Sequence, residues 1–216
     1  MKHNYFLSLL IFFFFLFAFS SCEQGCKCSK IEEEEKDDFK EDEIQEEKHC
    51  PELSNNFKRI IAEEYSELDL EEENSCSLLE KWKFINQRWY EQQKQMAVTK
   101  GSGWQITDSG ILYKVIYEGI GDNNYNGRPN DKSAVTISYT GYFFNDESFD
   151  SSTNYSNYLS GFVPGFQESL KLMKKNAIYE VIIPYELGYG EDGGTNIPPY
   201  TTLQFRIELV EFWTTQ

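Results

Sequence analysis

The sequence predicts an α+β fold in which a twisted antiparallel β-sheet wraps against one short α-helix, with a helical extension on its N-terminal side. Residues 135–139 and 203–209 alternate apolar and polar side chains, as half-buried antiparallel strands do. Between these two strands we expect one short helix and long turns. The aromatic residues of those turns would then border a hollow between sheet and helix.

Charge and histidine content exclude two classes of function. The chain has 36 acidic and 20 basic residues and a net charge of −16, which argues against a nucleic-acid partner. Most of the negative excess lies between Cys22 and Glu80, so the C-terminal part is near neutral. The only histidines are His3 and His49, which excludes a His-dependent catalytic triad from the C-terminal part.

The N-terminus has the pattern of an export signal. A charged start precedes an apolar run from Tyr5 to Phe19, then two serines and Cys22, so residues 1–21 are predicted to be a signal peptide. The run is shorter than the roughly 20 apolar residues of a membrane span. The segment resembles a lipobox with Phe19 in place of the usual Leu. We therefore expect lipidation at Cys22 and an exported lipoprotein anchored in a bacterial envelope, at the periplasmic face or the cell surface. An uncleaved anchor, or cleavage that leaves Cys22 unmodified, is the alternative.

Residues 22–50 are predicted to be an acidic, disordered tether, because they hold too few apolar residues to offset the entropy of ordering. Its glutamate run lacks the spacing and the turn glycine of a calcium loop. In an exported chain the four cysteines beyond Cys22 could form disulfides in three pairings. A zinc site built from them and His49 matches no familiar spacing, so we expect no metal. These cysteines are Cys26, Cys28, Cys50 and Cys76.

Residues 51–100 are predicted to form a helical extension. Apolar residues recur at helical spacing over residues 54–68 behind Ser54, and a second helix is expected to start at Ser77, where Glu80 completes a capping box. Its apolar stripe is Leu78, Trp82, Ile85 and Trp89. This stripe could dock on the rest of the chain or pair two chains, which leaves a homo-oligomer open. Gly101 to Gly103 mark the boundary with a domain at 101–216, whose first strand is expected at Ile111–Ile116.

Ordered motifs in the C-terminal part then indicate a family. They are SYTGYF, SFDSS, VPGFQESL and PYELGYG, the last followed by IPPYTTLQFRIEL. Together they resemble the FKBP-type peptidyl-prolyl isomerases over about Ile111 to Phe212. The resemblance implies a strongly twisted antiparallel sheet curled around one short helix. That helix is expected at Gly165–Lys174, with Phe166, Leu170 and Met173 facing the sheet.

The resemblance also implies a binding pocket. Asp150, Tyr189 and Tyr139 are its candidate catalytic residues, and Asp150 would either orient Tyr139 or polarise the surroundings of the substrate carbonyl. Val163 would act through its backbone N–H, and Phe166 would form the floor, where the family usually has Trp. The candidate substrate-binding residues are Phe149, Tyr158, Val163, Phe166, Ile197 and Phe205. The assignment of Tyr158 depends on a segment, 159–164, that is one residue shorter than usual.

The implied activity is rotation about X–Pro bonds in exported or envelope proteins by a non-covalent apolar pocket, without cofactor or metal. Proline-containing polypeptides are the expected clients, macrolide inhibitors are further candidate ligands, and a lipid anchor would supply the membrane contact. One alternative is a proline-directed chaperone or binding module with little turnover. Another is a structural lipoprotein that makes its contacts through the helix around Trp82 and Trp89.

Overall fold

The computed structural model of this chain describes residues 50–65, 73–120 and 127–214. The predicted signal peptide, the lipidation site Cys22 and nearly all of the predicted tether lie outside the described residues, as do Cys26, Cys28 and His49. Residues 46–216 form one compact unit. Among the described residues, no helix combines the length and the apolar character that crossing a membrane requires.

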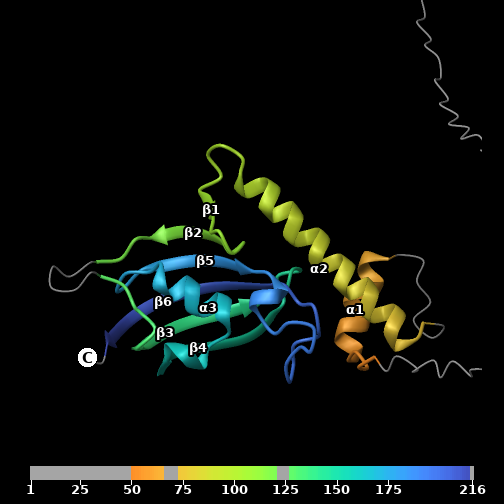
Figure 1. Cartoon of the computed structure of the whole chain (residues 1–216). Coiled ribbons are helices and arrows are strands. Elements are labelled where there is room, and N and C mark those ends of the chain that lie inside the picture. Colours follow the sequence, from red (N-terminus) through yellow and green to blue (C-terminus); the bar gives the residue numbers. More distant parts are fainter. Residues whose placement is uncertain (1–49, 66–72, 121–126, 215–216) are drawn as a thin grey trace, which may run out of the picture. The chain divides into compact units, whose positions relative to one another are not determined.

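Six antiparallel strands form one sheet in the order β1-β2-β5-β6-β3-β4 (Figure 1). The alternation predicted over residues 203–209 is confirmed, because Leu203, Phe205, Ile207 and Leu209 are all buried. The predicted mixture of antiparallel sheet and helix is likewise confirmed. The strands are β1 Trp104–Ile106, β2 Leu112–Tyr117, β3 Ser133–Tyr142, β4 Ser148–Tyr158, β5 Ile178–Ile183 and β6 Leu203–Thr214.

The expectation of long turns between the two alternating strands was wrong, because β4 and β5 lie there. β4 is an edge strand whose side chains are mostly exposed on both faces, so its sequence shows no alternation. β5 lies between β2 and β6 and reads as a nearly continuous apolar run, as expected of a strand covered on both faces. Ile111–Ile116 is also not the first strand. The three-residue β1 precedes β2 and pairs with it, and so short a strand carries no periodic signal.

The helix α3, Pro164–Lys171, packs against the sheet close to its predicted position. Phe166, Leu170 and Met173 are buried as predicted. The helix ends three residues earlier than expected, because the chain leaves the helical path in a turn that reaches Asn176 at a φ of 63°. Gly165 lets the helix approach closely, since a Cβ there would lie 2.3 Å from Ile183 Cγ2.

Two helices form the extension. α1 spans Asn55–Glu64 and α2 spans Ser75–Ala97. The N-cap of α2 is Asn74, whose side chain accepts a hydrogen bond from Ser77 N at 2.8 Å, so the predicted start at Ser77 was two residues late. Cys50 and Cys76 form a disulfide between the residues preceding α1 and the start of α2. Of the four cysteines whose pairing the sequence left open, these two are bonded to each other, and Cys26 and Cys28 lie outside the described residues.

The helical extension docks on its own chain. Trp82 is fully buried and its Nε1 donates to Thr201 Oγ1 at 3.0 Å, while Thr202 N donates to the buried Asn86 side chain. Figure 1 shows α1 and the first half of α2 at the end of the sheet that also holds the loop before β6. Side chains of both helices share one core cluster with the sheet. The Trp82 part of the apolar stripe is therefore used within the chain.

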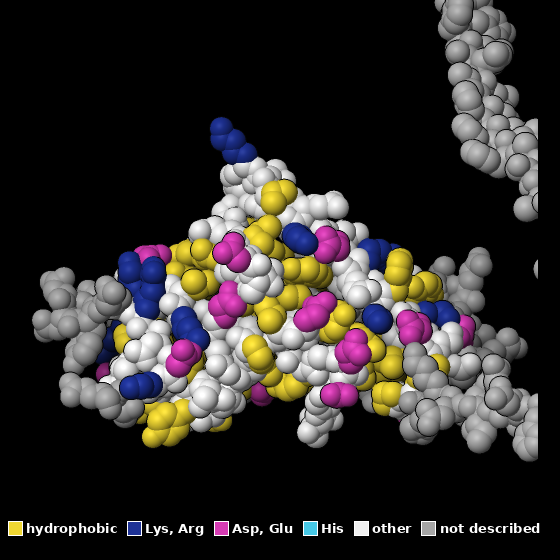
Figure 2. All heavy atoms as spheres, viewed as in Figure 1, with side chains coloured by type: hydrophobic (Ala, Val, Ile, Leu, Met, Phe, Trp, Pro, Cys, Tyr) yellow, Lys and Arg dark blue, Asp and Glu magenta, His cyan; other side chains and the backbone are white. Residues whose placement is uncertain are grey.

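The surface of the described part carries mixed charge. On the face drawn in Figure 2, acidic and basic side chains lie among apolar ones, and the basic ones do not merge into a continuous area. Several of these charges are paired across elements, for example Lys175 with Glu211 and Arg206 with Glu180. Solvent-exposed pairs of this kind contribute little to stability.

Candidate functional site

A cleft of about 190 Å³ lies between the sheet and the N-terminal end of α3. Strands β3, β4 and β6 supply one part of its lining, and the start of α3 and the loop before β6 supply the other. The residues come from segments up to 66 positions apart, and only the curled sheet brings them together. The cleft is lined by Tyr139, Phe149, Asp150, Gly161, Phe162, Val163, Phe166, Tyr189 and Phe205.

The floor of the cleft is a group of edge-to-face aromatic rings. The ring centroid of Phe166 lies 4.9 Å from that of Phe205 and 5.9 Å from that of Tyr139. Phe166 and Phe205 are buried at 3% and 5% exposure. Such ring pairs add about 0.5–1.5 kcal/mol each beyond the area they bury, so the packing of these rings stabilises an apolar floor.

Gly141 makes room for two of these rings. A Cβ at Gly141 would lie 2.5 Å from the Phe149 ring and 2.8 Å from the Phe205 ring. The two rings approach each other at 5.6 Å directly over the backbone of β3. The glycine of the SYTGYF motif is therefore required by the close approach of the cleft wall.

Tyr139 and Asp150 form the polar pair of the cleft. The Tyr139 hydroxyl donates to Asp150 Oδ2 at 2.7 Å, which fixes the tyrosine ring against the floor. Burial raises the pKa of the Tyr139 hydroxyl far above its usual range, and the hydrogen bond to Asp150 raises it further. Tyr139 is therefore a neutral hydrogen-bond donor at any physiological pH.

Two polar groups at the rim remain available. Within the described residues neither the Tyr189 hydroxyl nor the Val163 backbone N–H has a hydrogen-bond partner, whereas the Val163 carbonyl accepts from Phe166 N and Gln167 N. Burial, followed by the negative charge of Asp150, raises the pKa of Tyr189, so this hydroxyl also stays protonated. The cleft thus combines an apolar floor with two donors that could each bind a carbonyl oxygen.

Seven of the nine predicted site residues line this cleft: Tyr139, Phe149, Asp150, Val163, Phe166, Tyr189 and Phe205. The structure does not bring Tyr158 and Ile197 to it. Tyr158 is 61% exposed at the end of β4, where the short segment that follows directs the chain straight into the Leu159–Gly161 turn. Ile197 is buried elsewhere, because the loop before β6 folds back on itself through Gly194 N, which donates to Ile197 O at 2.7 Å.

Ile197 lies instead in a second cavity of about 460 Å³, which we call the groove. The groove is lined by residues of 51–57, by Phe143, Ser148 and Phe149, and by residues of 192–199. Phe149 lines both the groove and the cleft. The two cavities are therefore neighbours separated by one aromatic side chain.

Two residues of the cleft, Gly161 and Phe162, were not predicted from the sequence. Phe162 stacks on Phe166 with the ring centroids 5.0 Å apart, and it extends the apolar wall toward the rim. Phe162 lies in extended backbone two residues before the start of α3, so helical spacing does not reveal its contact with Phe166. Gly161 has no signal in the sequence either.

Residues 126–210 match the sequence profile of a family described as FKBP-type peptidyl-prolyl cis-trans isomerase. The chain carries an FKBP-type domain. The FKBP-type peptidyl-prolyl cis-trans isomerase FkpA of Escherichia coli is 34% identical over 116 residues, which cover 52% of this chain and 41% of FkpA. The outer membrane protein MIP of Legionella longbeachae is 34% identical over 113 residues, covering 50% of this chain and 46% of that protein.

The crystal structure of FkpA from Escherichia coli is similar to this chain with a TM-score of 0.57 and 28% sequence identity, covering 76% of this chain and 75% of that chain. This chain spans less than half the length of the two curated relatives. The matched profile ends within β6 and begins just before β3. It includes every residue of the cleft, whereas α1, α2, β1 and β2 lie outside it.

The FKBP-type domain presents no metal site within its described residues. No group of three or more His, Cys, Asp or Glu side chains is close enough to hold an ion in residues 50–65, 73–120 and 127–214. Every buried side-chain nitrogen or oxygen of these residues has a hydrogen-bond partner.

Proposed function

We propose that this chain is a peptidyl-prolyl cis-trans isomerase that rotates X–Pro bonds of exported or envelope proteins. The observation that carries the proposal is the cleft itself, an aromatic floor built by Phe166, Phe205 and Tyr139 with free donors at its rim. Its size suits a pyrrolidine ring rather than a large cofactor. Membership of the domain in an isomerase family supports the same activity.

The reaction that such a cleft accelerates has a high barrier and a small driving force. Rotation about a peptide bond crosses about 18–20 kcal/mol, while the X–Pro bond prefers trans by only about 0.5–1 kcal/mol. Uncatalysed rotation takes about 10–100 s at 25 °C. The planar amide is charge-separated and stabilised by water, and the twisted transition state is less polar. A dry apolar cleft therefore favours the transition state relative to the ground state.

Each polar group has a proposed role. Asp150 orients Tyr139 through their 2.7 Å hydrogen bond, which holds the ring that packs on the proline. The Val163 N–H and the Tyr189 hydroxyl bind the carbonyl groups that flank the proline and fix the peptide while its central bond turns. No proton is transferred in this scheme, which agrees with hydroxyls whose pKa values are raised.

The site of action is proposed from the N-terminal sequence. Residues 1–21 would direct export and a lipid on Cys22 would hold the protein at the membrane. The name of one relative, an outer membrane protein, supports a location in the envelope. Mass spectrometry of the mature N-terminus tests this part: a diacylated or triacylated Cys22 is expected, and an unmodified Cys22 would contradict it.

An isomerisation assay on a four-residue X–Pro peptide tests the activity. We expect wild-type protein to catalyse the exchange, and Tyr189→Phe and Asp150→Ala to lower kcat/KM by about two- to tenfold, the effect of losing one net hydrogen bond. Tyr117→Phe serves as the control, since Tyr117 is exposed on β2 and does not line the cleft. Unchanged activity in both cleft variants would contradict the proposed roles.

Binding measured on the same peptide separates catalysis from holding. A protein that binds the peptide without accelerating exchange would be a proline-directed binding module, and the isomerase proposal would then be rejected.

A macrolide inhibitor is the further ligand proposed for the cleft. The macrolide should compete with the peptide for the cleft. Phe166→Ala removes part of the floor and should weaken the binding of both ligands.

A further inference from the structure

The groove shares Phe149 with the cleft, and one of its walls is built by residues outside the matched domain. One of its walls is residues 51–57, which precede and open α1, and the opposite wall belongs to the loop before β6. Its volume, about 460 Å³, exceeds that of the cleft. Phe149 borders both cavities, which places the groove beside the cleft.

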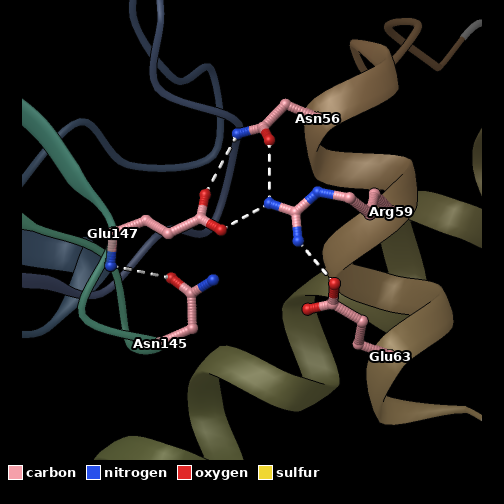
Figure 3. Close-up of polar contacts among 5 residues, drawn as sticks. All are labelled: Asn56, Arg59, Glu63, Asn145 and Glu147. Atoms are coloured by element: carbon pink, nitrogen blue, oxygen red, sulfur yellow. Dashed lines mark hydrogen bonds and ion pairs between the residues drawn. The ribbon is translucent and has the colours of Figure 1, made fainter.

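The wall at residues 51–57 contacts the turn between β3 and β4 through polar side chains. Figure 3 shows Glu147, from the turn between β3 and β4, facing Asn56 and Arg59 of α1. Arg59 forms an ion pair with Glu147 and donates to Asn56 Oδ1 at 3.0 Å. The hydrogen bond from the Arg59 guanidinium holds the pKa of the Glu147 carboxyl below its usual range.

Two further contacts fix the same wall. The Phe57 ring lies 5.1 Å from the Trp82 ring and 5.3 Å from the Phe143 ring, both in edge-to-face arrangement. The disulfide between Cys50 and Cys76 ties the residue before the wall to α2. The groove is thus preformed, and binding into it does not have to order α1 first.

The chemistry of the groove selects among ligands. Its lining includes the acidic residues Glu52 and Asp192 and no lysine or arginine. Glu52 shares its charge with Lys58 at 3.1 Å, whereas Asp192 is exposed and has no ion-pair partner among the described residues. The lining also includes the apolar residues Leu53, Phe57 and Ile197. An extended chain with a cationic side chain fits this lining, and an anionic ligand does not.

We propose that the groove binds the residues of a client polypeptide that flank the target proline, with preference for a Lys or Arg among them. This inference rests on the proposed function of the cleft and adds a substrate preference to it. The apolar residues of the groove contact the aliphatic side-chain carbons of the peptide. The carboxylates of Glu52 and Asp192 attract its cation. Because the wall at 51–57 lies outside the domain, the preference belongs to this chain and not to the domain alone.

The test compares peptides that share one X–Pro core. One is the four-residue core alone, and the others extend it by about six residues on either side, a reach of about 20 Å, carrying two Lys, two Glu or two Ser. Peptides extended on the N-terminal side of the core form one series and those extended on the C-terminal side form the other. In one of the two series, we expect the Lys peptide to exceed the Glu peptide in kcat/KM by about two- to tenfold at low ionic strength, the range for one or two exposed pairs. The difference should shrink in 0.5 M salt, a concentration at which the Debye length is about 4 Å.

Matched charge variants connect the preference to the groove. In the double variant Glu52→Gln/Asp192→Asn, kcat/KM on the Lys peptides should fall to its value on the Ser peptides. The same variant should keep the wild-type kcat/KM on the four-residue core. The control Glu91→Gln/Glu211→Gln removes the same charge from exposed ion pairs elsewhere and should retain the Lys preference. Equal rates for Lys and Glu peptides in both series, with full activity on the core, would overturn the inference and leave the isomerase proposal intact.

Failure of the isomerase proposal is recognised separately. If the core peptide is not turned over at all, fluorescence anisotropy with the same labelled peptides still reports binding in the groove. A Lys preference that disappears in the Glu52→Gln/Asp192→Asn variant would then support the groove without catalysis. Binding that is equal for Lys and Glu peptides would overturn the groove inference as well.

Discussion

Gly141 is the position in the cleft where a single added carbon should do most harm. In Gly141→Ala the new Cβ would meet the Phe149 and Phe205 rings at less than 3 Å. We expect the free energy of unfolding to fall by about 1–3 kcal/mol, as for other overpacked sites, and kcat/KM on the four-residue peptide to fall because both rings must move. Chemical denaturation and the isomerisation assay measure the two effects.

Thr140→Ala is the control for that substitution. Thr140 is the preceding residue of β3, and its side chain lies on the opposite face of the strand. The variant should keep wild-type activity on the short peptide. Equal activity in Gly141→Ala and wild-type protein would show that the rings have room to spare and would contradict the packing described for the wall.

Tyr139 should make the protein sensitive to alkaline pH. Its folded-state pKa is raised above the ordinary 10.0 by burial and by Asp150. The stability it contributes is therefore fully present below pH 10 and is lost as the pH rises toward the raised value. Unfolding curves at about pH 9 and about pH 11 should show a smaller loss of stability in Tyr139→Phe than in wild-type protein. Equal losses would contradict the buried, hydrogen-bonded hydroxyl.

Single residues of the site were predictable where a motif of the family fixed their place in the chain. Tyr139, Phe166 and Phe205 fall on regular elements, so the motif carried them to the cleft. Tyr158 precedes a segment that is shorter than usual, and Ile197 lies in a loop that folds back on itself. At such places the position in the sequence does not determine the direction of a side chain. Phe162 was missed because its role depends on a stacking contact across the start of α3.

At the scale of elements, α2 is attached to the loop before β6 mainly through Trp82. Trp82→Ala should lower the free energy of unfolding by about 3–5 kcal/mol, because it removes a fully buried ring and its hydrogen bond to Thr201. Phe84→Ala on the same helix is the control. Phe84 is 53% exposed, so its loss should change the stability by no more than about 0.5 kcal/mol.

Thermal and chemical denaturation of the two variants check this prediction. Similar losses in both would mean that α2 is held by its general apolar surface and not by the Trp82 contact. The same result would reopen the interpretation that the stripe serves another chain.

The elements themselves were predictable to the degree that one face of each was buried and the other was not. β3, β6 and α3 have this asymmetry; the two strands were recognised from their alternation, and the helix was placed from the family resemblance. β4 is exposed on both faces and β5 is covered on both, by α3 on one side and by the Leu112, Ile182 and Ala97 cluster near α2 on the other. Neither strand has the alternation that a sequence reveals, so both were mistaken for connecting turns.

At the scale of the whole molecule, residues 50–214 should unfold in one step. Side chains of α1, α2, α3 and the sheet belong to one core cluster, so loss of the helices would expose the core of the domain. Tryptophan fluorescence and far-UV circular dichroism should give coincident transitions. An early fluorescence transition, with the sheet signal retained, would show that the helical extension unfolds by itself and would contradict a shared core.

The arrangement of the whole molecule was the least predictable part. The sequence indicated a helical extension and a domain, but no periodicity or motif pairs residues 51–57 with the loop at 192–199. Both segments line the groove, and the wall at 51–57 is positioned by the Arg59–Glu147 ion pair and by the Phe57, Trp82 and Phe143 rings. The contacts with Glu147 and Phe143 join residues more than 80 positions apart, a separation at which pattern reading along the chain carries no information.

The bond between Cys50 and Cys76 makes the completeness of the groove depend on the compartment in which the chain matures. Disulfides form in oxidising surroundings and are kept open in a reducing cytosol, so a copy retained in the cytosol would possess the cleft without the covalent tie on its neighbouring wall. In such a copy, kcat/KM on the extended peptides and kcat/KM on the four-residue core would differ less. The ratio of kcat/KM on long peptides to kcat/KM on short peptides would then report whether the disulfide between Cys50 and Cys76 had formed.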